Sequence, residues 1–155
     1  MGIEIERKFL IKSDAWKALA SKGKICRQGY MVSDPKRTVR VRVMDDTGYL
    51  TVKGAAEGFS RMEFEYEIDK SDAEYMLLLC DRLVEKTRHV VKHDGLIWEV
   101  DVFEGANAGL VMAEVELHSE EQEIELPDWA GVEVTDDPRY YNAYLATHPF
   151  QSWLS

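Results

Sequence analysis

The sequence predicts a mainly β fold with antiparallel strands, and three observations support this prediction. First, apolar and charged residues alternate with a period of two in about eight segments of the 155-residue chain, as in strands whose successive side chains point to opposite faces. Second, turn sequences separate neighbouring segments, with DDTG at 45–48 and a hairpin-type HDGL at 93–96. Third, helix signals are few, so the architecture is all-β or α+β.

The alternation begins at the N-terminus of the chain. Glu4, Glu6 and Lys8 share one face of the first predicted strand, and apolar residues share the other. The further predicted strands lie at 28–32, 39–43, 49–53, 62–68, 86–90, 97–102 and 112–117. Apart from 28–32, each of these strands carries charged residues on one of its two faces.

Three helices are predicted between and after these strands. Ser13 is a suitable N-cap for a short amphipathic helix, and residues 71–74 form a capping box before the apolar run 75–80. Cys80 ends that run, which predicts a thiol in the core. A third helix over 136–147 would place three tyrosines and a leucine against the sheet.

The composition limits the classes of partner. The chain has 29 acidic and 19 basic residues and a formal net charge of -10, which argues against non-specific binding to nucleic acid or to an anionic membrane surface. A small anionic ligand stays open, because local charge can oppose net charge. The length suits a single domain that spans residues 1–155.

The sequence also bears on location. The longest apolar run, 76–80, is far too short to cross a bilayer, and the acidic N-terminus does not resemble a signal peptide. The two cysteines, Cys26 and Cys80, lack the spacing of a metal site. We therefore expect free thiols in a cytoplasmic protein that has no membrane partner.

The charged faces of the predicted strands together carry an almost entirely ionisable set of side chains. The carboxylates are Glu4, Glu6, Glu63, Glu65, Glu67, Glu99, Asp101, Glu114 and Glu116, and the bases are Lys8, Arg40, Arg42, Lys53, Lys86 and Arg88. After the first strand, each strand is nearly pure in sign. A one-sided sheet with a solvated face would explain each strand alone. The complete set favours a closed barrel with charges inside and apolar residues outside.

An enclosed set of carboxylates must be neutralised, because two like charges about 4 Å apart repel by roughly 4 kcal/mol at an effective dielectric constant of about 20. Acidic strands are therefore expected to lie opposite basic strands, or cations must enter the barrel. The carboxylates outnumber the bases by three, which suits a divalent metal ion such as Mg²⁺. Arginine and lysine suit phosphate oxygens. Carboxylate-held metal beside a group of bases is typical of phosphoryl transfer or phosphoanhydride hydrolysis.

The charged motifs form an ordered series along nearly the whole chain. They are EIERK at 4–8, RVR at 40–42, TVK at 51–53, EFEYE at 63–67, KTR at 86–88, EVDV at 99–102, AEVEL at 113–117, EVT at 133–135 and RYYN at 139–142. This series resembles the CYTH domain, or triphosphate tunnel metalloenzyme, superfamily, and in particular its small bacterial inorganic triphosphatases. The resemblance implies an α+β, mainly β fold, in which one CYTH domain forms a closed eight-stranded antiparallel β-barrel. Its interior would be a charged tunnel, and a few helices would pack outside.

The resemblance also implies roles for individual residues. The side chains expected to bind phosphate oxygens are Lys8, Arg40, Arg42, Lys53, Lys86 and Arg88. The expected ligands of Mg²⁺ or Mn²⁺ are Glu4, Glu6, Glu114 and Glu116, while Asp101, Glu63 and Glu65 would bind a second metal ion or hold the bases in place. The expected catalytic residues are Glu4, Lys8, Lys86 and Tyr30.

The implied activity is the metal-dependent hydrolysis of a small anionic triphosphate, with inorganic tripolyphosphate, cleaved to pyrophosphate and phosphate, as the first choice. Cyclase-type members carry a His-Phe pair ahead of ExExK, whereas here only three residues precede Glu4, which favours a hydrolase. The sequence shows no obvious motif for recognising an adenine or thiamine ring. The alternatives left open are a nucleoside or thiamine triphosphatase, a class IV-type adenylate cyclase and a non-catalytic polyphosphate-binding module. A homodimer is also left open.

Overall fold

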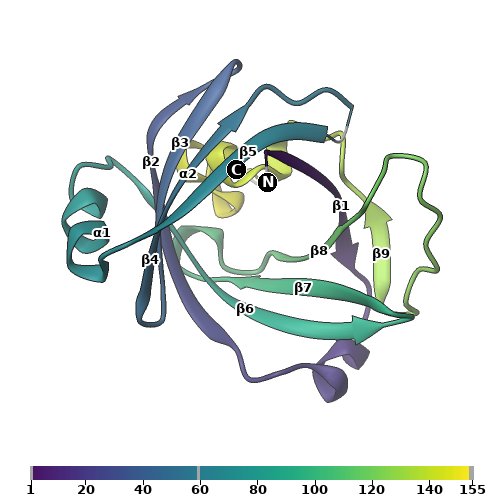
Figure 1. Cartoon of the computed structure of the whole chain (residues 1–155). Coiled ribbons are helices and arrows are strands. Elements are labelled where there is room, and N and C mark those ends of the chain that lie inside the picture. Colours follow the sequence, from purple (N-terminus) through teal and green to yellow (C-terminus); the bar gives the residue numbers. More distant parts are fainter. Residues whose placement is uncertain (1, 59, 154–155) are drawn as a thin grey trace.

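The computed structural model describes residues 2–58 and 60–153, and within them a closed antiparallel ring of strands dominates. The strands are β1 Ile3–Ile11, β2 Lys24–Asp34, β3 Arg37–Met44, β4 Thr47–Gly54, β5 Ser60–Ile68, β6 Leu83–His93, β7 Leu96–Phe103, β8 Val111–Glu116 and β9 Ala130–Glu133. The ring runs in the order β1, β5, β4, β3, β2, β6, β7, β8 and returns to β1 (Figure 1). This confirms the predicted eight-stranded barrel, to which β9 adds a short strand beside β1.

The ring closes at β1, which pairs with β5 near its start and with β8 further along. Ile3 lies opposite Met62 of β5, and Lys8 lies opposite Glu114 of β8. Because side chains alternate across a strand, a shift by one residue would exchange the two faces. The observed register directs most of the charged residues predicted for the interior, such as Glu4, Lys8 and Arg42, into the ring.

Two tight hairpins keep neighbouring strands in this register. Asp45 and Asp46 connect β3 to β4, and Asp94 and Gly95 connect β6 to β7. Asp45 has φ 50°, Asp94 has φ 50° and Gly95 has φ 76°. Positive φ at both central residues is typical of a twisted two-residue hairpin turn, and Asp94-Gly95 meets this requirement, whereas in the β3–β4 turn only Asp45 has a positive φ. Both predicted turns are confirmed.

The first two predicted helices form, with one corrected cap. Ser13 caps η1 (Asp14–Leu19), which is a 3₁₀ helix. The helix α1 (Lys70–Leu77) starts after Asp69, whose carboxylate accepts hydrogen bonds from two backbone N–H groups of the first turn. The predicted capping box at 71–74 is therefore wrong, because the carboxylate directly after β5 caps the helix two residues earlier.

The outer position of α1 depends on small side chains. Figure 1 shows α1 outside the ring, where Ala73 and Leu77 pack against Val41 and Val43 of β3. A Cβ at Gly48 would lie 2.7 Å from the Ala73 Cβ, so glycine permits the close approach. The predicted core thiol at Cys80 is only partly buried, because α1 has ended at Leu77 and the chain after it follows the surface.

The C-terminal segment contains two short helices instead of the single predicted one over 136–147. These are η3 (Pro138–Tyr140) and α2 (Asn142–Thr147), with an extended backbone at Tyr141 between them. Asp137 caps η3, and α2 begins as a separate helix after Tyr141. The other short helices are η2 (Gly105–Asn107) and η4 (Phe150–Ser152). Within the described ranges, no helix has both the length and the apolar character needed to span a membrane.

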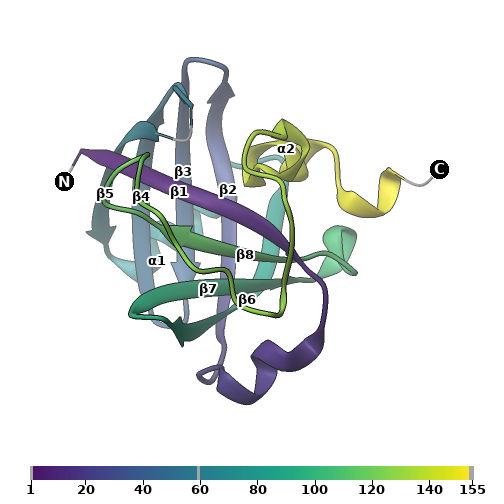
Figure 2. The ribbon, with the colours of Figure 1, turned by 90° about the vertical axis from the view of Figure 1, so that its right-hand side faces the viewer.

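The apolar core lies outside the ring, between the strands and the segments that cover them. Phe9, Trp98 and Trp129 form a cluster with Trp16 of η1, and Leu145 of α2 belongs to a second cluster. Figure 2 shows η1 below the barrel and α2 beside β2. Burying aromatic side chains on the outer face leaves the interior of the ring free for polar groups.

Candidate functional site

A cavity of about 750 Å³ occupies the interior of the ring. All eight strands of the ring and the segment around α2 contribute to its lining. The predicted site residues that line it are Glu4, Glu6, Lys8, Tyr30, Arg40, Arg42, Lys53, Glu63, Glu65, Lys86, Arg88, Glu114 and Glu116. Asp101 is the one predicted site residue that is absent from this lining. The volume lies within the range of small-molecule sites.

The charges divide the cavity into two walls. We call the strands β4, β3, β2 and β6 the basic wall and the strands β7, β8, β1 and β5 the carboxylate wall; each wall is a consecutive part of the ring. Lys8 and Arg61 are the cations of the carboxylate wall in the lining. At the two boundaries Lys53 lies opposite Glu63 and Arg88 lies opposite Asp101. Each acidic strand lies across the ring from a basic strand, as predicted, and strands of opposite sign are neighbours only at these two boundaries.

Arg42 is a buried cation of the basic wall whose guanidinium has an amide partner. Its Nε donates a hydrogen bond to Gln28 Oε1 at 2.9 Å. Among the described residues, no carboxylate oxygen lies within ion-pair distance of it. Burial and the neighbouring Arg40 and Arg88 lower the pKa of Arg42. A buried guanidinium that lacks a carboxylate partner and faces two others is a site for an anion.

Lys86 and Arg88 are held by a carboxylate behind them. Lys86 Nζ lies 2.8 Å from Asp101 Oδ2, and Arg88 donates to both Asp101 oxygens from Nε and Nη2 at 2.8 and 2.9 Å. Burial would raise the pKa of Asp101, but Arg88 and Lys86 hold that pKa well below its usual range. Burial lowers the pKa of Lys86 to about 8, against the raising effect of Asp101. Both Asp101 oxygens are engaged with these bases.

Lys53 bridges the two walls at the other boundary. Its Nζ donates to Glu4 Oε1 at 3.0 Å and lies 3.3 Å from Glu63 Oε2. Burial raises the pKa of Glu4, yet Lys53 brings it below its ordinary value, whereas burial and Glu4 raise the pKa of Glu63. Nearby, Arg40 Nη2 lies 3.5 Å from Glu65 Oε1. Glu63 and Glu65 therefore orient bases in this structure.

The carboxylate wall carries surplus negative charge around Glu6. Glu6 lies opposite Glu116 in the strand register, and Lys8 lies 3.9 Å from both Glu6 and Glu114. Burial, followed by the charges of Glu114 and Glu4, raises the pKa of Glu6 to about 8. Burial and the charges of Glu4 and Glu99 also raise the pKa of Glu116. Among the described residues, Glu6 has only Lys8 within ion-pair distance and Glu116 has no such cation, whereas Arg88 Nη2 also lies 3.9 Å from Glu114.

The donor chemistry of this wall fits a divalent metal ion. Hard cations such as Mg²⁺ bind carboxylate oxygens and retain several water molecules. The pKa values of Glu6 and Glu116 are raised in part by neighbouring carboxylates, and a bound cation would offset this repulsion. Within residues 2–58 and 60–153, no three carboxylate, histidine or cysteine side chains converge closely enough to form a complete ligand group. The wall therefore offers a partial ligand set that water and phosphate oxygens would complete.

Tyr30 lines the cavity beside the basic wall, on β2. Its hydroxyl accepts a hydrogen bond from Gln28 Nε2 at 3.2 Å. The Gln28 side chain is fully buried and also bonds to Asn142 and Arg42. The sequence analysis missed Gln28 as a site residue, although it shares the strand parity of Tyr30. Asn142 was also missed, because only the folding of the C-terminal segment brings it to the cavity.

Arg61 is a cavity cation that the sequence analysis overlooked. It lines the cavity and lies opposite Glu4 in the pairing of β5 with β1. Its guanidinium carbon lies 5.5 Å from the ring centroid of Tyr141, and Lys8 Nζ lies 5.1 Å from the same centroid. Arg61 shares the parity of Glu63 along β5, so extending that alternation backwards by two residues would have found it.

Comparisons with known proteins identify the relatives of this chain. A model of the CYTH domain matches residues 2–141. The chain is 50% identical over 155 residues to an inorganic triphosphatase of Acetivibrio thermocellus, covering 99% of both chains. It is 38% identical over 152 residues to an inorganic triphosphatase of Nitrosomonas europaea, covering 92% of this chain and 96% of the relative.

Solved structures show the same architecture. The crystal structure of the inorganic triphosphatase NE1496 superposes with a TM-score of 0.64 at 36% identity, covering 92% of this chain and 93% of that one. A conserved protein of Pyrococcus furiosus has a TM-score of 0.60 at 23% identity, covering 76% of this chain and 80% of that one. The second likeness concerns the fold alone.

Proposed function

Since the chain belongs to the CYTH domain family, we propose that it is a divalent-metal-dependent inorganic triphosphatase that cleaves tripolyphosphate to pyrophosphate and phosphate. One observation carries the proposal: the enclosed cavity places a basic wall opposite a carboxylate wall. The basic wall suits the phosphate oxygens, and the carboxylate wall suits a metal ion. The full-length similarity to two inorganic triphosphatases supports the same substrate.

In this proposal the phosphates lie along the basic wall. Lys8, Arg40, Arg42, Lys53, Lys86 and Arg88 would contact the phosphate oxygens, and each of them lines the cavity. Arg42 offers a guanidinium group that can bind phosphate through two parallel hydrogen bonds, and Arg88, whose Nε and Nη2 donate to Asp101, would contribute its positive charge. Asp101 would orient Lys86 and Arg88 rather than bind a second metal ion, since both its oxygens already contact these bases.

The carboxylate wall would hold Mg²⁺ or Mn²⁺ through Glu4, Glu6, Glu114 and Glu116. When bound, such an ion polarises a phosphoryl oxygen and lowers the pKa of a coordinated water molecule. Glu63 and Glu65 would remain in their contacts with Lys53 and Arg40.

Hydrolysis requires water to attack one phosphorus atom while the bond to the bridging oxygen breaks. Lys8 and Lys86 would stabilise the negative charge that develops on the phosphoryl oxygens and the leaving pyrophosphate. Glu4 would contribute as a ligand of the metal ion. Tyr30, which lines the cavity on β2, would orient the reacting phosphate. Lys8 and Lys86 are buried within the ring, so their charges would act at a lower effective dielectric constant than in bulk water.

A nucleoside or thiamine triphosphate is the second candidate substrate, because the cavity is also lined by Tyr30, Tyr49, Tyr141 and Tyr144. Aromatic rings of this kind can stack on a base. The inorganic substrate is preferred because the charged groups dominate the lining. Both cysteines are free, which is in keeping with the proposal of a reducing, cytoplasmic location.

The test is a phosphate-release assay with tripolyphosphate, ATP and thiamine triphosphate, each with Mg²⁺ or Mn²⁺ and each with a chelator. The proposal expects phosphate mainly from tripolyphosphate and only with metal. Preferential turnover of ATP or thiamine triphosphate would support the second candidate. Cyclic AMP would identify a cyclase, and tight binding of tripolyphosphate without turnover of any substrate would leave a polyphosphate-binding module.

A further inference from the structure

A chain of buried amide groups connects two cations of the basic wall. Asn142 Oδ1 accepts hydrogen bonds from Lys86 Nζ at 2.9 Å and from Gln28 Nε2 at 3.2 Å. Gln28 Oε1 in turn accepts from Arg42 Nε at 2.9 Å. The contacts therefore run from Lys86 through Asn142 and Gln28 to Arg42, across β2, which lies between the strands of the two cations.

The orientation of both amides follows from their partners. Lysine and arginine side chains only donate hydrogen bonds, so Lys86 and Arg42 must face amide oxygens. The remaining Gln28 NH₂ group then points to Asn142 and to the hydroxyl of Tyr30. The polar atoms that this network joins are all buried or face the cavity, and removing one amide would leave a buried donor or acceptor unsatisfied.

The neutrality of these acceptors matters for the site. A carboxylate would orient Arg42 equally well, but its charge would cancel the field that attracts an anion. An amide oxygen fixes the direction of the N–H groups and leaves the positive charge available to phosphate. Arg42 has this kind of partner in place of a carboxylate, and Lys86 has Asn142 in addition to Asp101.

Asn142 also connects the cavity to the C-terminal segment. It is the first residue of α2, and the residue before it, Tyr141, places its ring 5.1 Å from Lys8 Nζ. Two consecutive residues of this segment therefore contact two of the three lysines that line the cavity. The helix α2 packs beside β2 and β6, which brings Asn142 to Lys86.

We infer that Asn142 and Gln28 are positioning residues, which hold Lys86 and Arg42 in the orientation that tripolyphosphate requires and make that orientation depend on α2. This inference rests on the proposed function for its substrate. It goes beyond the proposal by assigning a role to two uncharged residues and to the C-terminal segment. The role operates through Lys86 and Arg42, so it must disappear when those side chains are removed.

The test combines kinetics with a binding cycle. Asn142→Ala and Gln28→Leu should each lower kcat/KM by about tenfold or more, since displacements near 1 Å at a reacting group have effects of this size or larger. The matched control is Asn107→Ala, because Asn107 is also a buried asparagine and its Oδ1 holds the C-terminal segment through the Phe150 N–H at 2.8 Å. Asn107 lies outside the cavity lining, so its variant should lose thermal stability and keep kcat/KM within about twofold.

The binding cycle separates positioning from a general loss of structure. The Kd for tripolyphosphate is measured by calorimetry without metal for the wild type, Asn142→Ala, Lys86→Ala and the double variant. Asn142→Ala should weaken binding about tenfold in the wild-type background and less than about twofold in the Lys86→Ala background. An equal factor in both backgrounds would overturn the inference, as would a control variant that loses as much activity as Asn142→Ala.

Two further variants keep the test decisive. If Asn142→Ala does not fold, the same cycle is run with Gln28→Leu in the Arg42→Ala background, with the same expected pattern. Asn142→Asp keeps the acceptor and the shape of the side chain but adds a negative charge. It should fold normally and weaken tripolyphosphate binding, so unchanged binding would contradict the requirement for a neutral acceptor. Wild-type protein that binds tripolyphosphate without cleaving it would defeat the proposed function, while the cycle would still decide the inference.

Discussion

The carboxylate of Asp101 lies 2.8 Å from the ammonium nitrogen of Lys86, and both side chains are only 1% exposed. Arg88 completes the group by donating to both oxygens of the same carboxylate. The orientation of two bases is thus fixed before any substrate enters. Such preorganisation removes the need to order long side chains during binding.

Removing the Asp101 charge should strongly destabilise the protein. Asp101→Asn leaves Lys86 and Arg88 buried beside each other, and breaking a buried ion pair from one side costs about 3–5 kcal/mol. Urea unfolding should show this loss in the free energy of unfolding. Asp137→Asn is the control, because Asp137 forms an exposed pair with Arg139 and should leave stability nearly unchanged. Equal effects of both substitutions would contradict the assigned importance of the buried group.

The metal-free protein should lose stability through Glu6 as the pH rises. Glu6 has its pKa raised from 4.5 to about 8 in the folded protein, so between these values the folded state holds a proton that the unfolded chain has released. The stabilisation is complete below pH 4.5 and is lost as the pH rises to about 8. Glu6→Gln cannot titrate and should escape this loss.

The measurement is the melting temperature of both proteins with a chelator at pH 5 and pH 8. The advantage of Glu6→Gln over the wild type should grow from pH 5 to pH 8, and a constant difference would contradict the raised pKa of Glu6. Added Mg²⁺ or Mn²⁺ at pH 8 should stabilise the wild type more than Glu6→Gln, because only the wild type retains the charged ligand.

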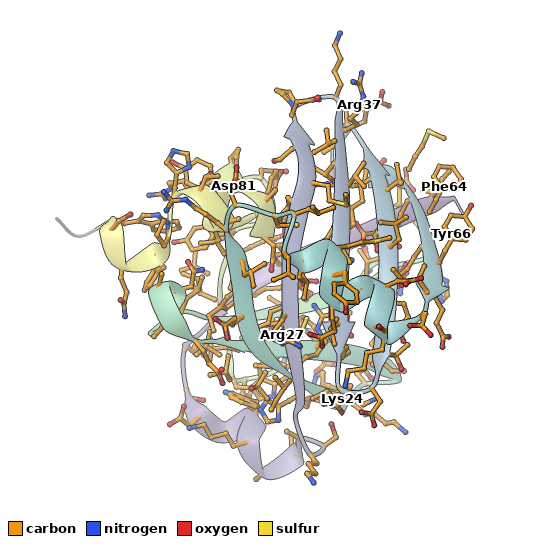
Figure 3. All side chains as sticks on the ribbon, turned by 90° about the vertical axis from the view of Figure 1, so that its left-hand side faces the viewer. Lys24, Arg27, Arg37, Phe64, Tyr66 and Asp81 are labelled. Atoms are coloured by element: carbon orange, nitrogen blue, oxygen red, sulfur yellow. The ribbon has the colours of Figure 1, made fainter. Side chains whose placement is uncertain are left out.

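Arg42→Ala should weaken tripolyphosphate binding. A hydrogen-bonded charged contact contributes about 1.5–3 kcal/mol, so the Kd should rise by roughly ten- to a hundredfold. The dependence of the Kd on salt should also become weaker. Figure 3 shows Arg27 on the outer face of β2, where it pairs with Glu74 of α1. Arg27→Ala removes the same charge outside the cavity and should leave the Kd unchanged. An unaltered Kd for Arg42→Ala would remove Arg42 from the binding site.

The barrel was predictable because its evidence is periodic. In Val39-Arg40-Val41-Arg42-Val43, each residue type recurs at the period of a strand, and the complementary charges of β4 and β5 make their pairing electrostatically favourable. The ring of strands and the location of most of the predicted charges in its cavity follow from this pattern, although Glu67 and Asp101 are absent from the lining. The series of motifs correctly indicated the family, since several weak motifs in a fixed order are specific together.

Contacts that depend on tertiary packing left no periodic signal. Asn142 reaches Lys86 only because the C-terminal segment breaks at Tyr141 and folds beside β2. The cap of α1 was misplaced because Asp69 and Ser71 are both good N-cap residues. Asp69 is the N-cap because β5 ends at Ile68, directly before it.

Glu116→Gln should separate catalysis from binding. Glu116 lies on the carboxylate wall opposite Glu6 and lines the cavity, so the substitution removes a proposed metal ligand and leaves every base of the basic wall in place. Turnover of tripolyphosphate should fall by at least about a hundredfold, a loss that even outer-shell changes at metal sites can reach. The Kd for tripolyphosphate without metal should stay near the wild-type value or decrease, because one negative charge has left the cavity.

Phosphate release and calorimetry on the same preparation measure the two effects, with a titration of Mn²⁺ from low to high concentration. Glu121→Gln is the matched control, since Glu121 lies in an exposed turn outside the cavity lining. It should behave as wild type in both measurements. Near-normal turnover by Glu116→Gln at ordinary metal concentration would show that the ligand set lies elsewhere on the carboxylate wall. Loss of metal-free binding would instead place Glu116 in the support of the basic wall.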